Sequence, residues 1–265
     1  DEVCTRWKKA DLSNQNDLIK ALEDYDNWML LGSSGKTGLY IQLKSFLDMN
    51  SPKWKAELNK ITDFSTDIQN RIQFFEMRIA RIPKEKQPII SDIRYKNFLQ
   101  RLFAKSPYLL SEEEERILNL KAPTSYSNWV RMVEGFLSKE TALVKGKKKS
   151  FSELQSLMES QNKDIRDSAA KAFNLILIRN VDAAEAEINS ILQDKYIDDK
   201  LRKLPKPESA RHIEDDIPTD IVDNLIACVE KRFDIAKRYY KLKAKLLGVK
   251  KLKYHERNVQ YGSIR

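Results

Sequence analysis

The sequence predicts an almost entirely α-helical, multi-helical fold, and three observations carry this prediction. Residues that interrupt helices are few, with 7 glycines and 8 prolines in 265 residues. Good helix formers dominate, since 33% of the residues are charged and Lys, Glu, Leu, Ala and Ile are abundant. Apolar residues reach 41% and recur at helical spacing, which excludes a disordered charged chain. A chain of this length holds one large domain or two smaller ones.

The clearest periodic segment predicts one long helix that begins at Pro52 and stops before Pro83. Its seam alternates by four and three residues through Trp54, Leu58, Ile61, Ser65, Ile68, Ile72, Phe75, Ile79 and Ile82. Such a seam serves either an intermolecular coiled coil or an internal helix hairpin. We favour the internal hairpin.

Other helices follow from caps and breakers. We expect them over residues 17–31, 90–103, 112–120, 128–136 and 165–195, with a last long helix from Ile221 that Gly248 ends. Ser111 with Glu114, and Ser150 with Glu153, have the spacing of capping boxes. The run KGKKK at 145–149 predicts a turn or hairpin, and the proline-containing stretch 204–218 predicts the longest irregular linker.

Positive charge is concentrated in the last segment of the chain. The net charge is +9, and residues 231–265 alone hold 12 Lys or Arg against 2 acids. Such a segment suits nucleic acid or another anionic surface. A simpler interpretation is a solvated helix face, or a face whose acidic partner lies elsewhere. Tyr239 and Tyr240 are adjacent and cannot share a helix face, so stacking platforms for bases are missing and nucleic acid is not favoured.

Cellular location is predicted from the cysteines and from the hydropathy pattern. Two cysteines, Cys4 and Cys228, do not make a disulfide framework, which predicts a reducing cytoplasm. The longest aliphatic run, 175–178, falls far short of the roughly 20 residues of a membrane span. The N-terminus lacks the pattern of a signal peptide, and its start at Asp1 rather than Met suggests a trimmed or partial product.

One glycine-rich motif invites a comparison with phosphate-binding loops. The sequence GSSGKT at 32–37 has two residues between its glycines, where such a loop needs four. The preceding residues 17–31 have the pattern of an amphipathic helix rather than a buried strand. We therefore expect a turn between helices and no nucleotide site.

The remaining candidates for chemistry are two histidines and a cysteine. His255-Glu256 begins an H-E-x-x-H motif, but position 259 is Val, so the second histidine ligand is missing. His212 precedes three acids at 214–216, and we interpret this cluster as a charge match for the N-terminus of the next helix rather than a metal site. Cys228 is expected to be a small buried residue, not a nucleophile. No catalytic, cofactor-binding or metal-ligating residue is assigned.

Five stretches, in order along the chain, carry a family resemblance. They are FFEMRI at 74–79 followed by Ile82-Pro83, LSEEEERIL at 110–118, the tryptophan-containing segment 127–136, Asp164-Ile165-Arg166 with Ala169 and Ala170, and YYKLKAKLLG at 239–248. They resemble elements of the oligoendopeptidase F family of thimet-oligopeptidase-like zinc metallopeptidases: FFELEL, LSEEEEKIL, a short tryptophan-containing helix, D-R-x-x-R-x-x-A and RYYRLKAKLLG. The chain departs from the family at residues 254–258, where the family carries Tyr-Asp before Ala-Pro.

This resemblance implies the N-terminal lobe and the first helices of a thimet-oligopeptidase-like peptidase fold. Residues 1–108 would form an N-terminal helical region, 109–195 the family's N-terminal helical domain, and 196–265 the beginning of the catalytic domain. The family implies a cytosolic zinc metalloendopeptidase that hydrolyses short peptides inside a channel, of which this part would form a wall. In the family, the zinc ligands and catalytic residues lie downstream of the YYKLKAKLLG helix. None maps onto this chain, which is therefore expected to be inactive alone.

Two other classes of function stay open. The basic segment 231–253 could make the chain a binding module for nucleic acid or an acidic protein partner. The seam over 54–82 could instead build a coiled-coil scaffold. The oligomeric state is not predicted.

Overall fold

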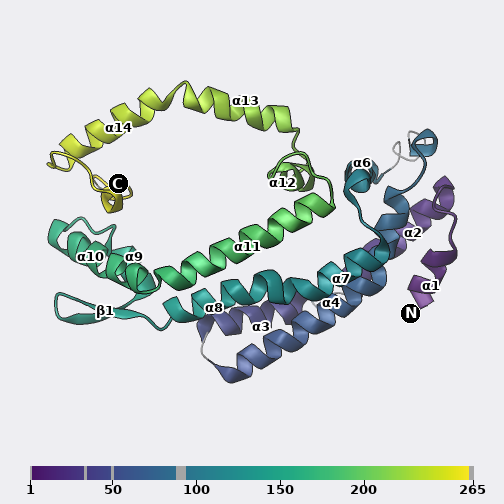
Figure 1. Cartoon of the computed structure of the whole chain (residues 1–265), viewed down its shortest axis with the longest axis horizontal. Coiled ribbons are helices and arrows are strands. Elements are labelled where there is room, and N and C mark those ends of the chain that lie inside the picture. The colour runs from purple at the N-terminus through teal and green to yellow at the C-terminus, as the bar shows by residue number, and fades with distance from the viewer. Residues whose placement is uncertain (1, 33–34, 49–50, 88–93, 263–265) are drawn as a thin grey trace. The chain divides into compact units, whose positions relative to one another are not determined.

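The computed structural model describes residues 2–32, 35–48, 51–87 and 94–262, and it confirms the helical fold class (Figure 1). The chain divides into two compact units. Unit 1 comprises Asp1–Ser127 and Gln193–Pro218, and unit 2 comprises Asn128–Leu192 and Thr219–Arg265. Each unit has a hydrophobic cluster of its own.

Unit 1 consists of helices joined by short turns. The helices are α1 (Glu2–Lys9), α2 (Gln15–Gly32), α3 (Gly35–Leu47), α4 (Pro52–Ala80), α6 (Lys96–Lys105), α7 (Glu112–Ala122) and α12 (Ser209–Glu214). Two 3-10 turns, η1 (Lys84–Lys86) and η2 (Ser106–Tyr108), and a π-helical turn, η3 (Pro123–Ser127), complete this list. Helix α11 (Val181–Leu201) contributes its last turns to unit 1 and the rest to unit 2.

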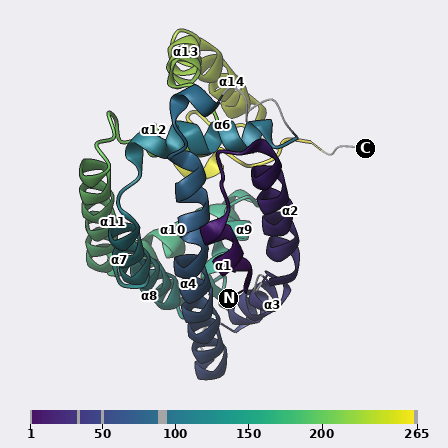
Figure 2. The ribbon, with the colours of Figure 1, turned by 90° about the vertical axis from the view of Figure 1, so that its right-hand side faces the viewer.

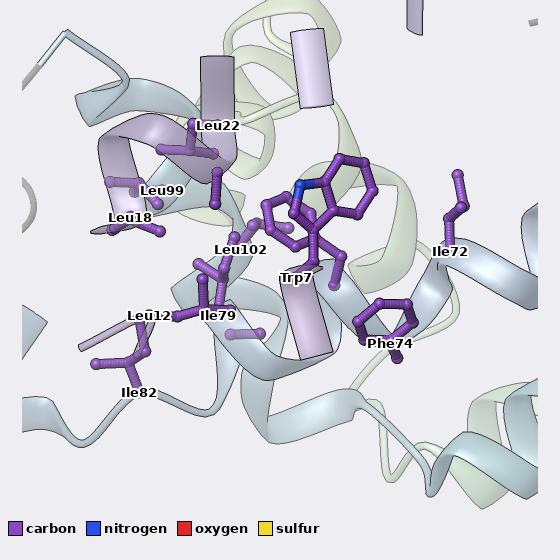
Figure 3. Close-up of a cluster of buried hydrophobic side chains, with 13 residues drawn as sticks. Trp7, Leu12, Leu18, Leu22, Ile72, Phe74, Ile79, Ile82, Leu99 and Leu102 are labelled. Atoms are coloured by element: carbon purple, nitrogen blue, oxygen red, sulfur yellow. The ribbon is translucent and has the colours of Figure 1, made fainter. Parts of the chain in front are cut away.

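The core of unit 1 forms around Trp7, which has an exposed fraction of 1%. Its indole ring lies 4.6 Å from the ring of Phe75 and 5.7 Å from that of Tyr25. Leucines of α2 and α6 and isoleucines of α4 gather around it (Figure 3). The guanidinium group of Arg78 donates to the carbonyls of Trp7, Lys8 and Ala10, so it caps the end of α1 and fixes it beside α4 (Figure 2).

Helix α4 has the predicted boundaries and the predicted internal packing. Pro52 occupies its first turn, where the missing N–H costs nothing, and the helix ends two residues before Ile82-Pro83. The seam contacts α1, α3, α6 and α7 of the same chain. From Ile72 onward the seam residues Phe75, Ile79 and Ile82 are buried. The second half of the seam is therefore buried within the chain, as the hairpin interpretation predicts, whereas the seam residues over 54–68 are half-buried.

Unit 2 begins with α8 (Asn128–Leu137) and a hairpin of β1 (Thr141–Val144) and β2 (Lys147–Ser150), followed by α9 (Phe151–Leu157) and α10 (Lys163–Arg179). The strands are antiparallel, and Val144 pairs with Lys147 across a two-residue turn. Lys145 and Gly146 in that turn both have positive φ, at 50° and 78°, as a tight hairpin turn requires. Val144, Leu154, Ala169, Ala172 and Ile176 form the buried core.

The last elements of unit 2 are α13 (Thr219–Glu230), α14 (Phe233–Leu246) and the 3-10 turn η4 (Tyr254–Glu256). Figure 1 shows α13 and α14 as two helices that meet at a bend. Gly248, with φ of 66°, turns the chain after α14. The chain then returns to α10, which η4 contacts.

Both predicted capping boxes are present. The hydroxyl of Ser111 accepts from the Glu114 N–H at 3.2 Å, and the Glu114 carboxylate accepts from the Ser111 N–H at 2.8 Å. Ser150 and Glu153 make the same pair of bonds at 3.3 and 2.8 Å. Each box satisfies N–H groups that a helix start leaves free.

The predicted helix boundaries were wrong at four places. The helix expected over 165–195 is two helices, which meet at Asn180, whose side chain also bonds to the carbonyl of Ile176. The last helix from Ile221 is likewise divided, between Glu230 and Phe233, and no glycine or proline marks this break. The linker 204–218 contains α12. Residues 94–95 form a turn, so the helix expected over 90–103 begins only at Lys96; its first residues lie outside the described part.

Candidate functional site

The most deeply buried charged contact of unit 2 joins Arg166 of α10 to Glu256 of η4. Their side chains have exposed fractions of 3% and 1%. The guanidinium Nε and Nη2 donate to Oε1 of Glu256 at 3.1 and 2.8 Å, and Nη1 donates to the Gln161 carbonyl at 3.0 Å. Oε2 accepts from the Lys253 N–H at 2.9 Å. Burial works against the ionised form, but these hydrogen bonds lower the pKa of Glu256.

Asp167, the next residue of α10, collects three cationic or polar donors. Nε2 of His255 lies 2.8 Å from Oδ1, and because a carboxylate only accepts, Nε2 donates. The amines of Lys163 and Lys253 lie 2.5 and 3.4 Å from Oδ2. Although burial opposes it, the hydrogen bonds from Lys163 and His255 hold the pKa of Asp167 well below its usual range. Together with the Arg166–Glu256 pair, this network attaches residues 253–256 to α10.

Asp167, His255 and Glu256 are also the one group of metal-ligand type found among the described residues, with ligand atoms within 4.8 Å of one another. Zinc needs lone pairs that are free to coordinate it. Here the carboxylate oxygens are already bound by Lys163, His255, Arg166 and the Lys253 backbone. The group therefore fits an internal salt-bridge network and does not fit zinc. His212 lies on α12 and is not part of this group.

Unit 1 contains a cavity of about 390 Å³ between α4, α6, α7 and the segment that follows α11, with both polar and apolar residues in its lining. Arg202 donates to both oxygens of Glu115 at 2.5 and 2.8 Å, and the Leu110 N–H adds a third bond to Oε1 at 3.2 Å. Nearby, the Asn119 amide donates to Asn70 and Gln73. The two bonds between Arg202 and Glu115 attach residues 193–218 to α7, in agreement with the place of this late segment in unit 1.

A larger hollow, of about 1160 Å³, lies in unit 2 between α14 and the segment after Gly248. Seven lysines line it, together with apolar residues and Glu256: Lys163, Lys237, Lys241, Lys245, Lys250, Lys251 and Lys253. We call it the lysine hollow. Six of these lysines belong to residues 231–265, so the hollow contains half of the 12 basic residues of that segment. The basic segment is therefore not spread evenly over solvent, but partly folded around a concave surface.

Large apolar side chains on α13 and α14 are exposed. Leu225 and Leu242 have exposed fractions of 61% and 56%, and no residue of α13 is buried. The other exposed members are Ile221, Ile226, Val229, Phe233, Ile235, Tyr239 and Leu246. We call these residues the apolar arm. So many exposed large apolar side chains on two successive helices indicate an interaction site.

The structure corrects the prediction for Cys228, and the middle of the glycine-rich motif lies outside the described residues. Cys228 is exposed, not buried, because α13 buries none of its faces. Gly32 ends α2 and Gly35 begins α3, which agrees with a turn between helices; Ser33 and Ser34 lie outside the described residues. None of the described helices combines the length and apolar character of a membrane span.

Sequence reasoning missed the pairing of Arg166 with Glu256. The only local signal was the His255-Glu256 dipeptide, which was interpreted as an incomplete zinc motif. The two partners are 90 residues apart, and no periodicity or cap connects such positions. The glutamate that would have served a zinc enzyme as base is here an ion-pair partner.

The chain is similar in sequence and in fold to oligopeptidases. A family model described as oligopeptidase F matches residues 91–134. Oligoendopeptidase F from a Lactococcus lactis subsp. cremoris plasmid is 24% identical over 236 residues, which cover 83% of this chain and 38% of that protein. Group B oligopeptidase PepB from Streptococcus agalactiae is 21% identical over 238 residues, covering 83% and 39%.

The solved structures agree with these sequence matches. Oligoendopeptidase-F from Enterococcus faecium superposes with a TM-score of 0.77 at 16% identity, covering 98% of this chain and 54% of that one. The resemblance to the oligoendopeptidase F family is thereby confirmed, for the N-terminal part of that fold. The chain spans 38% of the length of the first curated relative it matches.

Proposed function

We propose that this chain is the N-terminal helical part of an oligoendopeptidase F-like zinc metalloendopeptidase that hydrolyses short peptides. In this proposal, residues 109–195 form the family's N-terminal helical domain, and residues 196–265 begin the catalytic domain. The helices would form one wall of a channel that admits short peptides. Its two cysteines, both free, favour a reducing cytoplasm.

The apolar arm is the observation that carries this proposal. Leu225 and Leu242 are more than half exposed, although leucine on an amphipathic helix normally faces a core. Further protein packed against α13 and α14 would remove this apolar surface from water. Such burial stabilises by roughly 25 cal/mol for each Å² of apolar surface. The relatives contain such further protein, because this chain matches 38% of the length of the first of them.

The chemistry would be supplied by residues outside this sequence. The described residues do not fit zinc, because Asp167, His255 and Glu256 are committed to internal pairs. We therefore assign no catalytic step to this chain and propose that it is inactive alone. Its own contribution would be to position a peptide and to exclude water from the channel.

A complementation experiment tests the proposal. The part of the Lactococcus relative that lies beyond its aligned region is produced separately and mixed with this chain, and cleavage of an internally quenched short peptide is followed. We expect chelator-sensitive cleavage from the mixture and none from either part. The relative's own N-terminal part is the positive control.

Substitutions in the arm sharpen this test. Leu225→Asp with Val229→Asp should abolish complementation, whereas Asn224→Asp, an exposed polar position of the same helix, should not. Failure of this chain where the relative's own part succeeds would contradict the proposal. Chelator-sensitive turnover by the pure chain would contradict its inactivity.

A further inference from the structure

The lysine hollow has the features of a binding site whose ligand carries negative charge. Lys237, Lys241 and Lys245 are spaced by four along α14, so they lie on one face of the helix. Gly248, at φ of 66°, reverses the chain and brings Lys250 and Lys251 to the same hollow. Like charges at this spacing repel one another and weaken the helix, so this arrangement costs stability unless an anion occupies it.

No acidic side chain of the described residues balances these five lysines. None of Lys237, Lys241, Lys245, Lys250 and Lys251 forms an ion pair with another residue in the described part of the chain. The two other lysines, Lys163 and Lys253, share Asp167. Glu256, the one acid that lines the hollow, is neutralised by Arg166. The hollow therefore presents an uncompensated positive potential.

The surface between the lysines is apolar. Tyr240, Ala244, Val249 and Leu252 line the hollow, and the methylene stems of the lysines add to them. A simple inorganic anion would leave this apolar surface uncovered. A ligand that carries carboxylates and apolar side chains together matches both parts of the lining.

The type of cation and the aromatic content argue against nucleic acid. All seven basic residues of the hollow are lysines, whereas bidentate phosphate recognition favours arginine. Among the described residues Tyr240 is the one aromatic side chain in the lining, which is too few to stack successive bases. A volume of about 1160 Å³ exceeds the roughly 300–1,000 Å³ of small-molecule pockets, which favours a chain-like ligand.

We infer that the lysine hollow binds an acidic peptide segment that also carries apolar side chains. This inference rests on the proposed function, since a peptidase wall is where a peptide would be held, and it adds the charge class of that peptide. Carboxylates of the peptide pair with Lys237, Lys241, Lys245, Lys250 and Lys251. Its apolar side chains contact Val249 and Leu252.

Direct binding by the whole chain tests this inference without any cleavage. The probe is a short fluorescent peptide of alternating Glu and Leu, followed by anisotropy. The comparison probe has Gln in place of every Glu, and a fluorescent oligothymidylate represents phosphate polymers. We expect the Glu-Leu peptide to bind, the affinity to fall as salt is raised, and the other two probes to bind at least tenfold more weakly, a factor equal to about 1.4 kcal/mol.

A matched pair of variants locates the site. Lys241→Gln with Lys245→Gln should weaken binding about tenfold, on the scale of two exposed ion pairs. Lys147→Gln with Lys148→Gln removes the same charge from exposed positions of β2, outside the hollow, and should leave binding unchanged. Equal binding of the Gln-Leu peptide, tighter binding of oligothymidylate, or equal effects of the two variant pairs would each overturn the inference.

The two proposals can fail separately. If complementation succeeds but the Glu-Leu peptide does not bind the hollow, the charge class is wrong and the proposed function stands. If the Glu-Leu peptide binds with the expected variant pattern but complementation fails, the peptidase proposal is wrong and the acidic-peptide site stands.

Discussion

At the scale of single residues, Arg166 and Glu256 decide how the last described turn is held. Glu256 is 1% exposed, and its carboxylate is surrounded by donors from Arg166 and from the Lys253 backbone. A buried ion pair can contribute no more to the free energy of unfolding than two apolar residues in its place, but a buried charge without a partner lowers that free energy strongly. Removing one partner should therefore destabilise unit 2 more than replacing both partners by apolar residues.

We expect Arg166→Met to destabilise unit 2 by about 3–5 kcal/mol, because it leaves Glu256 buried without its partner. The double variant Arg166→Met with Glu256→Leu should recover much of this loss. The measurement is hydrogen exchange of the α10 amides in urea. Arg179→Met, which removes an exposed pair with Glu140 from the same helix, should cost less than about 1 kcal/mol. Equal losses for Arg166→Met and Arg179→Met would contradict the buried-pair argument.

The residues that line these networks were only partly predictable. Arg166 falls in a family-like motif and the lysines follow from the charge count, so both were noticed in the sequence. That Lys250 and Lys251 meet Lys241 depends on the turn at Gly248 and on the return of the chain to α10. Such contacts between distant positions are set by tertiary packing, which local patterns do not encode.

At the scale of elements, the cap of α9 offers a clean test of local stability. Ser150 accepts from the Glu153 N–H, and replacing such a cap by alanine costs about 1 kcal/mol. Ser150→Ala should lower the free energy of unfolding of unit 2 by that amount. Ser152 is exposed and lies two residues after Ser150, in the first turn of α9. Ser152→Ala should leave the free energy of unfolding unchanged or raise it slightly, because alanine favours a helix more than serine does. Comparable losses in thermal unfolding of both variants would argue against the capping box.

The same cap predicts a pH dependence. The Lys149 amine, with the N–H and hydroxyl groups of Ser150, lowers the pKa of Glu153 to about 2. The pKa of a glutamate in an unfolded chain is about 4.3. The stabilisation that the ionised Glu153 carboxylate gives the folded chain is therefore fully present above this pH, and it is lost as the pH falls toward about 2. The difference in thermal midpoint between the wild-type chain and Glu153→Gln should shrink over this window. A difference that stays constant from pH 6 to about 2 would contradict it.

The helices that the sequence predicted share a strong local signal, and those it missed lack one. The long helix at 52–80 has a proline at its first turn and a continuous seam, and both capping boxes lie where Ser and Glu predict them. The breaks at Asn180 and at Arg232 carry no glycine or proline. Helix α1 is short, and it is held by Arg78 and by the burial of Trp7, which are contacts across the fold.

At the scale of the whole molecule, the apolar arm makes the isolated chain prone to associate. We expect it to bind a hydrophobic dye and to self-associate as concentration rises, because large apolar residues of α13 and α14 face water. Leu225→Ser with Val229→Ser should reduce both effects, measured by dye fluorescence and light scattering. Asn224→Ser with Glu230→Ser, at exposed polar positions of α13, should change neither. A monodisperse monomer without dye binding would contradict this prediction.

The contact between Arg166 and Glu256 also has a consequence for synthesis on the ribosome. Unit 1 has all of its residues once position 218 has emerged, and it can then fold while the chain is still growing. Arg166 must wait for Glu256, 90 residues later, before its charge is balanced. At about 5–20 residues per second, this delay lasts several seconds. During that interval the core residues of the second unit, all of which precede residue 180, are already available, but Arg166 lacks its buried partner.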